Sequence, residues 1–372
     1  TAGDLNSLRN SRLLTSDNVS RTKSSLKPDG VLYVMTEYDT DRYVNDDIAG
    51  LLSVLNSTLR LSFDNVSFWP GTRTLIFASD APLEALDENT LASRIAGLAY
   101  MPVHVNDYLL YDRFEPLKTE RLEEALQSGA PVHSLDRPVL NHLHAAWQSH
   151  AFAVDRFILG SVLGASWWLM LLPLAVAVCW VLSLRGKSAG RQYGLFLYFT
   201  AGVSSLALEL IGFYVYQSTV GSLYSELAVL IGVFMLGLAA GTWVTVRWTN
   251  DRSGISALIV LIGAAVLYLG MFDRVHPNLL LVFHLLFFFT TALGTGSLFV
   301  FATRRYYGRS KSNRGLGYAV ELAGSALGAL VTTTLLLPRI GLRSLMWWII
   351  GLLVLALAGA VISLRREPVA RV

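Results

Sequence analysis

The pattern of hydrophobic and polar positions changes near residue 156. Before this point, apolar and polar residues are mixed in short periodic runs; after it, about seven long apolar stretches alternate with short, mostly basic connections. Each stretch reaches the roughly 20 residues that a helix needs to cross about 30 Å of hydrocarbon. We therefore predict a soluble domain over residues 1–155 and an all-α transmembrane bundle of about seven helices over residues 156–372. The predicted spans are Phe157–Leu184, Tyr193–Gln217, Glu226–Val246, Gly254–Phe272, Asn278–Ala302, Gly315–Pro338 and Leu345–Leu364.

The soluble domain alternates helical and strand patterns. The predicted order is helix, strand, helix, strand, strand, and the last two strands form a hairpin around Pro70-Gly71-Thr72. Asn45 or Asp46 is expected to cap the second helix. The predicted elements are helix Leu5–Leu26, strand Val31–Met35, helix Asn45–Phe63, strands Val66–Trp69 and Thr74–Ala78, helices Leu83–Leu98 and Arg113–Gln127, and a Pro- and His-containing approach to the membrane over Ala130–His150.

Three strands with helices between them form an incomplete sheet. One edge would leave its backbone N–H and C=O groups unpaired, and part of one face would lack cover. We therefore expect a further segment to complete the sheet, either preceding Thr1 in a precursor or supplied as a separate chain.

The distribution of Lys and Arg predicts the sidedness of the bundle. The formal net charge is only +3, but most of the basic excess borders the membrane. By the positive-inside rule, the C-terminus is cytoplasmic and, with seven spans, the soluble domain lies outside the cytoplasm of a bacterial inner membrane. The basic residues of the predicted cytoplasmic side are Arg185, Lys187, Arg191, Arg247, Arg252, Arg304, Arg305, Arg309, Lys311, Arg314, Arg365, Arg366 and Arg371. The other side has only Arg274, Arg339 and Arg343.

Several short stretches occur in an order that resembles a known family. In the soluble part they are Leu26-Lys27-Pro28-Asp29-Gly30-Val31-Leu32, Leu55-Asn56-Ser57-Thr58-Leu59-Arg60, Trp69-Pro70-Gly71 and Phe77-Ala78-Ser79-Asp80. In the membrane part they are Ala207-Leu208-Glu209, Phe234–Gly241 and Tyr318–Gly328. Together they resemble the last third of a spermidine synthase domain, and more closely the membrane-fused spermidine synthase-like proteins of bacteria.

The resemblance implies a partial Rossmann-like, methyltransferase-type sheet that ends in an antiparallel hairpin. Family members bind decarboxylated S-adenosylmethionine on a glycine-rich loop and use an aspartate, and both features would fall before Thr1. This chain alone is therefore expected to hold no cofactor, whereas a complete assembly would bind an S-adenosylmethionine derivative and transfer an aminopropyl group. Because the charge count places the soluble domain outside the cytoplasm, enzymatic activity stays an open question.

Acidic residues follow the first predicted strand. Relatives tend to carry Gln in this region, whereas this chain has Glu37, Tyr38 and Asp39. Their side chains could attract a polyamine cation, because ligands of open α/β sheets bind at the carboxyl ends of strands. A solvated acidic loop is the alternative.

Three ionisable residues fall within predicted spans. Glu209, His284 and Glu321 are costly at membrane depth, and such groups usually face a bundle interior or a water-filled cavity. They could form a cation or proton site in a transporter-like module, or each could be satisfied by a hydrogen bond to a neighbouring helix. We favour the second interpretation for His284.

Four histidines of the soluble domain raise the question of a metal site. His133, His142, His144 and His150 lie before the membrane without a partner at ligand spacing, so no metal site is predicted. His142 and His144 could share a strand face but not a helix face.

We expect a lipid bilayer and a completing polypeptide as partners, and no nucleic acid. A non-catalytic assembly subunit that docks a partner by strand addition remains a further alternative.

Overall fold

The computed structural model divides the chain into two units, Thr1–Ser161 and Val162–Val372, called here the lobe and the bundle. It describes residues 8–83, 88–100, 107–149, 171–183, 189–221, 224–247, 253–307 and 314–366. The domain boundary predicted at residue 155 lies outside the described residues.

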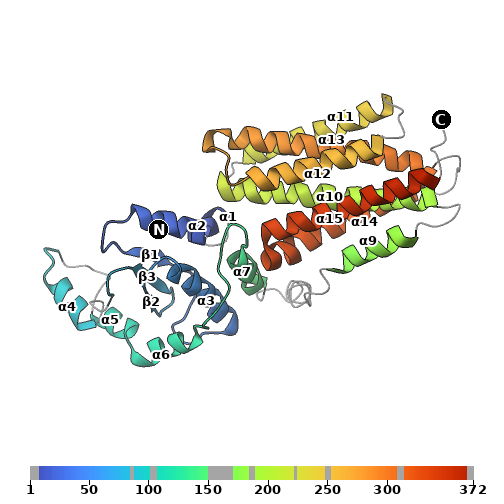
Figure 1. Ribbon diagram of the computed structural model, residues 1–372. Helices are drawn as coiled ribbons and strands as arrows, with labels where there is room; N and C mark the ends of the chain where they lie inside the picture. Colours follow the sequence, from blue (N-terminus) through green and yellow to red (C-terminus); the bar gives the residue numbers. More distant parts are fainter. Residues whose placement is uncertain are drawn as a thin grey trace. The chain divides into compact units, whose positions relative to one another are not determined.

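The lobe combines short helices with three strands (Figure 1). Its elements are α1 (Leu8–Ser11), η1 (Arg12–Leu14), α2 (Ser16–Ser25), β1 (Leu32–Met35), α3 (Asp46–Arg60), β2 (Asn65–Trp69), β3 (Leu75–Ser79), α4 (Glu88–Ala96), α5 (Asp107–Arg113), α6 (Pro116–Ala125) and α7 (Val139–Ser149).

The strands form an antiparallel sheet in the order β1-β3-β2. The predicted hairpin is confirmed, since β2 pairs with β3 from Asn65 opposite Ser79 to Trp69 opposite Leu75. Strand β1 pairs with the other edge of β3, with Val34 opposite Ile76. Because β3 is antiparallel to both neighbours, β1 and β2 run parallel to each other, and α3 connects them along the chain.

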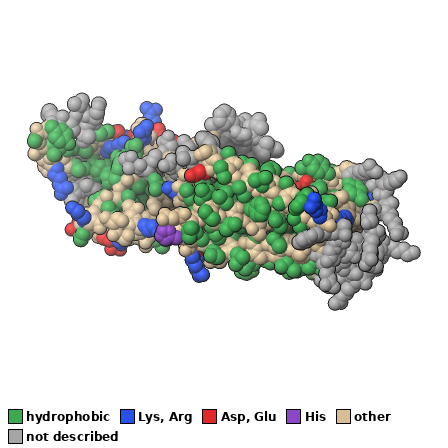
Figure 2. Space-filling model, turned by 90° about the horizontal axis from the view of Figure 1, so that it is seen from above, with side chains coloured by type: hydrophobic (Ala, Val, Ile, Leu, Met, Phe, Trp, Pro, Cys, Tyr) green, Lys and Arg blue, Asp and Glu red, His purple; other side chains and the backbone are tan. Residues whose placement is uncertain are grey.

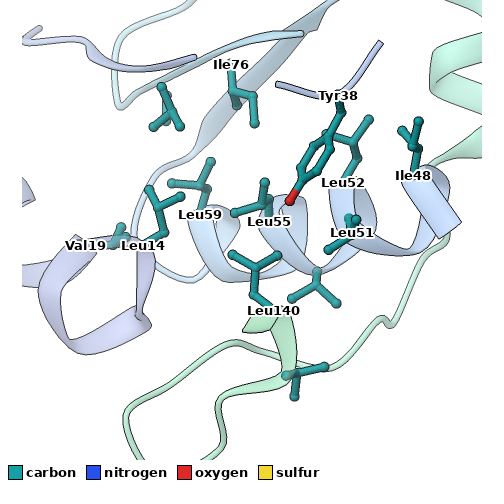
Figure 3. Packing of buried hydrophobic residues seen from close by; sticks show 14 of the residues in the cluster. Leu14, Val19, Tyr38, Ile48, Leu51, Leu52, Leu55, Leu59, Ile76 and Leu140 are labelled. Atoms are coloured by element: carbon teal, nitrogen blue, oxygen red, sulfur yellow. The ribbon is translucent and has the colours of Figure 1, made fainter. Parts of the chain in front are cut away.

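Helix α3 is the centre of the lobe core. Asn45 caps it by accepting a hydrogen bond from the Ile48 N–H at 2.8 Å, as predicted. Leu51, Leu55 and Leu59, spaced by four residues, are fully buried. Figure 3 shows α3 between Ile76 of the sheet and Leu140 of α7. Each such side chain contributes about 1.5–3 kcal/mol by leaving water.

The second face of the sheet carries a row of aromatic rings. Tyr33 lies 5.3 Å from Phe77, Phe77 lies 4.6 Å from Trp69, and Trp69 lies 4.7 Å from Phe114, measured between ring centroids. These rings are exposed or half-buried, in contrast to the closed core on the α3 face. The two faces of the sheet are therefore covered unequally within the described residues.

Three helix predictions for the lobe need correction. The first helix is broken at Thr15, whose extended backbone and side chain cap a new helix, α2, through the Asn18 N–H. The charged helix starts at Pro116 instead of Arg113, because proline lacks the N–H that an interior position requires. The approach to the membrane over Ala130–His150, for which no helix was predicted, contains helix α7, so His142 and His144 do not share a face.

The bundle consists of long apolar helices whose axes lie side by side (Figure 1). Its elements are α9 (Leu172–Ser183), α10 (Ala189–Thr219), α11 (Tyr224–Arg247), α12 (Ser253–Met271), η3 (Pro277–Leu279), α13 (Leu280–Tyr307), α14 (Arg314–Leu330), the π-helical turn η4 (Val331–Leu336) and α15 (Leu337–Arg366).

Glycines allow these helices to approach closely. A Cβ atom added at Gly237 of α11 would lie 2.6 Å from the Phe289 carbonyl oxygen of α13. One added at Gly324 of α14 would lie 2.6 Å from the Phe199 carbonyl oxygen of α10. Both glycines belong to small-xxx-small pairs, Gly237/Gly241 and Gly324/Gly328, and all four lie close to the backbone of a neighbouring helix within the bundle.

The described residues contain five helices long and apolar enough to cross a membrane. The last of them, Gly315–Ala360, is 46 residues long. As a straight helix it would measure roughly 70 Å, more than twice the hydrocarbon thickness. Gly341 interrupts it with φ 81° and ψ 166°, a conformation that glycine adopts readily.

The chain reverses direction at this break. A Cβ at Gly317 would meet Tyr198 of α10, and the Tyr193 hydroxyl of α10 donates to the Ala356 carbonyl oxygen at 2.9 Å. Both ends of the 46-residue stretch therefore lie against the first third of α10. Of the predicted span Phe157–Leu184, only α9 and its immediate flanks are described, so the count of seven is not confirmed.

Apolar side chains cover the outside of the bundle (Figure 2). Met235, Leu236 and Trp243 on α11, and Ile259 and Leu267 on α12, are all exposed. A surface of this kind is unfavourable in water and matches the hydrocarbon of a bilayer. The chain is a multi-pass membrane protein by the length and composition of these helices.

Candidate functional site

The carboxyl end of β1 is held rigidly against the start of β3. The Thr36 N–H donates to the Thr74 carbonyl oxygen at 3.0 Å, and the Thr74 N–H donates to the Tyr38 carbonyl oxygen at 3.1 Å. The hydroxyls of Thr40 and Thr74 lie 2.9 Å apart. All three threonines are buried, so this hydrogen-bonded ladder fixes the backbone that carries Glu37, Tyr38 and Asp39.

Tyr38 points into the core of the lobe. Its side chain is fully buried, and its hydroxyl lies 3.0 Å from Nδ1 of His144 on α7. The Trp147 ring packs edge-on against Tyr38 with centroids 5.3 Å apart. Burial, followed by the Glu37 charge, raises the pKa of Tyr38, so the phenol stays protonated. Tyr38 is thus a structural anchor, in contrast to the exposed binding residue that the sequence allowed.

The two predicted acidic residues differ in their surroundings. Glu37 Oε1 lies 3.5 Å from Nε2 of His144, and the Glu37 side chain keeps 29% exposure. Asp39 is exposed and accepts a hydrogen bond from the Asp41 N–H at 2.9 Å. Both can therefore meet a ligand from solvent at the carboxyl end of β1.

A lysine offsets the negative charge nearby. Lys118 Nζ on α6 donates to Asp41 at 2.7 Å and also contacts Asp112 and Glu115. Hydrogen bonds from Lys118 to Asp112 and then to Asp41 raise the pKa of the ammonium group. The charge of Asp41 is therefore already paired and adds little to the attraction of a cation at this end of β1.

His133 belongs to the lobe core. Nε2 lies 3.0 Å from the Ser11 hydroxyl, and the Leu140 N–H donates to Nδ1 at 3.4 Å. Burial lowers the pKa of His133 from 6.5 to about 4, so the ring is neutral at pH 7. Within the described residues, no three His, Cys, Asp or Glu side chains are grouped to hold a metal ion.

The three ionisable residues of the bundle occupy separate places. Gly202 of α10 packs so closely against α14 that an added Cβ would contact the Glu321 backbone. Further along α10, the centroid of the Tyr216 ring lies 5.1 Å from that of the His284 ring. Fourteen residues separate Gly202 from Tyr216, which is about 21 Å along a helix. Glu321 and His284 therefore do not form one site. Glu209 is partly buried on α10 between these two levels.

His284 is part of an interhelical hydrogen-bond network. Its Nδ1 lies 2.7 Å from the Leu280 carbonyl oxygen, and its Nε2 lies 3.1 Å from the Tyr268 hydroxyl of α12. Tyr216 donates to Glu226 of α11 at 2.8 Å. Both ring nitrogens of His284 have partners, which agrees with the favoured interpretation as a satisfied core histidine.

Sequence reasoning missed the residues that support these sites. His144 was considered only as a metal ligand, although helical spacing in Val139–Ser149 places His144 on the same face as the buried Leu140. The hydrogen-bonded ladder of Thr36, Thr40 and Thr74 could not be recognised from the sequence, because it joins residues more than 30 positions apart.

Comparisons with known proteins complete the description. The chain matches no protein-family model, no curated protein and no solved structure.

Proposed function

We propose that this chain is the membrane-anchored, C-terminal part of a spermidine synthase-like protein. In this proposal, polypeptide outside the given sequence completes the sheet and supplies both the loop for an S-adenosylmethionine derivative and the general base. The reaction is aminopropyl or related transfer to an amine. The bundle anchors the assembly in the bilayer.

The arrangement of β1, α3, β2 and β3 carries this proposal. A pair of parallel strands joined by a helix is the building unit of α/β folds. The closing hairpin, in which β3 returns between β1 and β2, agrees with the end of a methyltransferase-type sheet that the resemblance implies.

The outer edge of β1 supports completion by another strand. Thr36 directs its N–H toward β3, so by alternation the backbone groups of Leu32 and Val34 also face β3. Those of Tyr33 and Met35 face the outer edge, and no strand in the described ranges pairs there. Unpaired strand edges are templates for strand addition.

A pair of proline variants tests the edge. Met35→Pro removes an N–H from the outer edge, where proline is tolerated, and leaves the bonds to β3 intact. We expect the variant to fold but to lose the completing polypeptide during purification from membranes. Val34→Pro is the matched control, because it removes a bond to β3 and destabilises the lobe by about 1–3 kcal/mol.

Cofactor binding tests the activity. A labelled S-adenosylmethionine analogue is expected to bind the assembly purified from membranes and not this chain alone. The proposal fails if intact mass analysis finds no upstream or partner polypeptide and the analogue does not bind.

A transporter-like module is the second candidate function. The observation that favours it is the position of Glu209 and Glu321 on α10 and α14, two helices in contact at membrane depth. A cation or polyamine would pass these carboxyl groups. Uptake of labelled putrescine into proteoliposomes that is abolished by Glu209→Gln would favour this function over the first.

A further inference from the structure

One end of the bundle gathers arginines from three helices. Arg191 at the start of α10 donates to the Tyr306 hydroxyl at 3.3 Å, and its guanidinium carbon lies 5.0 Å from the Tyr306 ring centroid near the end of α13. Arg304, also near the end of α13, donates to the Thr245 carbonyl oxygen of α11 at 2.8 Å. The start of α10 and the ends of α11 and α13, where Arg247 lies, are therefore at the same level of the bundle.

Trp243 and Arg247 indicate that this level is a membrane interface. Trp243 is 58% exposed on α11, and the Arg247 guanidinium carbon lies 4.2 Å from its ring centroid, one turn later. Tryptophan rings concentrate at the level of the lipid headgroups, and arginines near helix ends extend toward it. Arg191 and Arg247 are both exposed, so both guanidinium groups are accessible at this level.

Acidic residues do not balance these arginines in the described part of the bundle. Glu321 is the nearest acidic residue there, seven residues after the start of α14 and so roughly 10 Å along the helix. In the sequence, the connections between these helix ends add basic residues against one acidic residue, Asp251. The added basic residues are Arg185, Lys187, Arg252, Arg309 and Lys311.

The opposite end of the bundle contains both signs of charge. Asp273, just after α12, pairs with Arg343 at 2.5 Å, and Glu226 near the start of α11 accepts a hydrogen bond from Tyr216. The positive excess is therefore confined to one end. Such an excess at one headgroup level attracts anionic lipid to that level.

We propose that the basic end of the bundle is a docking surface for the headgroups of anionic phospholipids. Arg247 and Arg191 bind the headgroups, because a guanidinium group that rests on an aromatic ring presents its N–H edge to phosphate oxygens. Arg304 is engaged by carbonyl oxygens of α11, and Arg305 is buried, so neither is assigned to lipid. This inference goes beyond the proposed function and does not depend on it.

Lipid binding to the full chain in detergent tests the surface. We expect native mass spectrometry to show tighter binding of phosphatidylglycerol than of phosphatidylcholine. Arg247→Gln is expected to weaken phosphatidylglycerol binding by about fivefold, which corresponds to about 1 kcal/mol for one arginine near an anionic surface. Arg247→Lys keeps the charge and is expected to retain most of the affinity. Arg274→Gln is the matched control, because it removes an exposed arginine from the opposite end.

Three results of this experiment overturn the inference. The first is equal binding of the two lipids. The second is a loss in Arg274→Gln as large as in Arg247→Gln, because net charge alone would then explain the binding. The third is displacement of phosphatidylglycerol by an equal concentration of inorganic phosphate, because the surface would then recognise free phosphate.

Thermal unfolding in nanodiscs gives an independent measurement. Replacing phosphatidylcholine by phosphatidylglycerol is expected to raise the unfolding temperature of the wild-type protein more than that of an Arg191→Gln, Arg247→Gln double variant, because a ligand of the folded state stabilises it. The shift is expected to shrink at high salt, because salt screens exposed charges. An equal shift in both proteins overturns the inference.

Discussion

Exposed apolar side chains have different explanations in the lobe and in the bundle. In the bundle, Leu236 and Leu267 lie on the outer faces of long apolar helices, where hydrocarbon is the solvent. In the lobe, Leu98 and Tyr111 are exposed on or beside α4 and α5, and Tyr33 begins the aromatic row beside the open edge of β1. Such groups are unfavourable in water when they gather in one region.

This difference shows how to interpret exposed apolar side chains in a protein that meets both lipid and water. In the bundle, the backbone N–H and C=O groups are paired within each helix, so lipid alone can cover its outer face. The lobe has an edge strand, and lipid cannot pair with backbone N–H and C=O groups. The apolar exposure around α11 therefore indicates a bilayer, whereas the exposure beside β1 agrees with the added polypeptide of the proposed function.

Leucine truncation is the strongest way to sharpen this comparison. Leu55→Ala removes a fully buried side chain from the lobe core and is expected to cost about 2–5 kcal/mol. Leu236→Ala removes a lipid-facing side chain and is expected to change stability by less than about 0.5 kcal/mol. Pulse proteolysis in nanodiscs measures both. A large effect of Leu236→Ala would show that α11 is covered by protein.

Acidification should destabilise the lobe through His133. Its pKa is about 4 in the folded chain because of burial and 6.5 as the ordinary value. The unfolded state therefore binds the proton more strongly, so stability is complete above about pH 6.5 and falls by about 3 kcal/mol toward pH 4. Protection factors of α3 amides at pH 7 and pH 4.5 measure this loss. In His133→Asn we expect lower stability at pH 7 but a flatter pH dependence.

Glycine substitutions give a smaller effect in the bundle. Gly241→Ala places a Cβ against the Leu293 backbone of α13 and is expected to destabilise the bundle by about 1–3 kcal/mol. Gly232→Ala, on the same helix, meets nothing within 4 Å and is expected to be neutral or slightly stabilising. Thermal unfolding in detergent compares the two. Equal midpoints would contradict the close approach of α11 and α13.

Local chemistry explains which parts of the fold the sequence predicts. Helix α3 was predicted with its cap, because the four-residue spacing of its leucines and the Asn45 side chain act within a few residues. The hairpin was predicted from Pro70-Gly71 between two β-prone runs. The break at Thr15 was missed, because apolar spacing alone does not show that a threonine side chain will start a new helix.

The candidate sites depend on contacts between distant residues. The position of Glu37 was predicted from its place after a strand, but its contact with His144 joins residues that are 107 positions apart. The sequence could not separate His284 from Glu321 either, because the level at which two helices cross depends on packing. Glycine positions such as Gly202 set that level, and their partners appear only in the folded chain.

The turn at Gly341 has a consequence for membrane topology. If α14 and α15 each cross the bilayer, the helices from α10 onward cross it six times in all. An even number returns the chain to the leaflet from which it started, so the beginning of α10 and the end of α15 share a compartment. The compartment of the lobe then follows from the apolar stretch around Cys179: if this stretch crosses the bilayer once, the lobe lies on the opposite side from the end of α15.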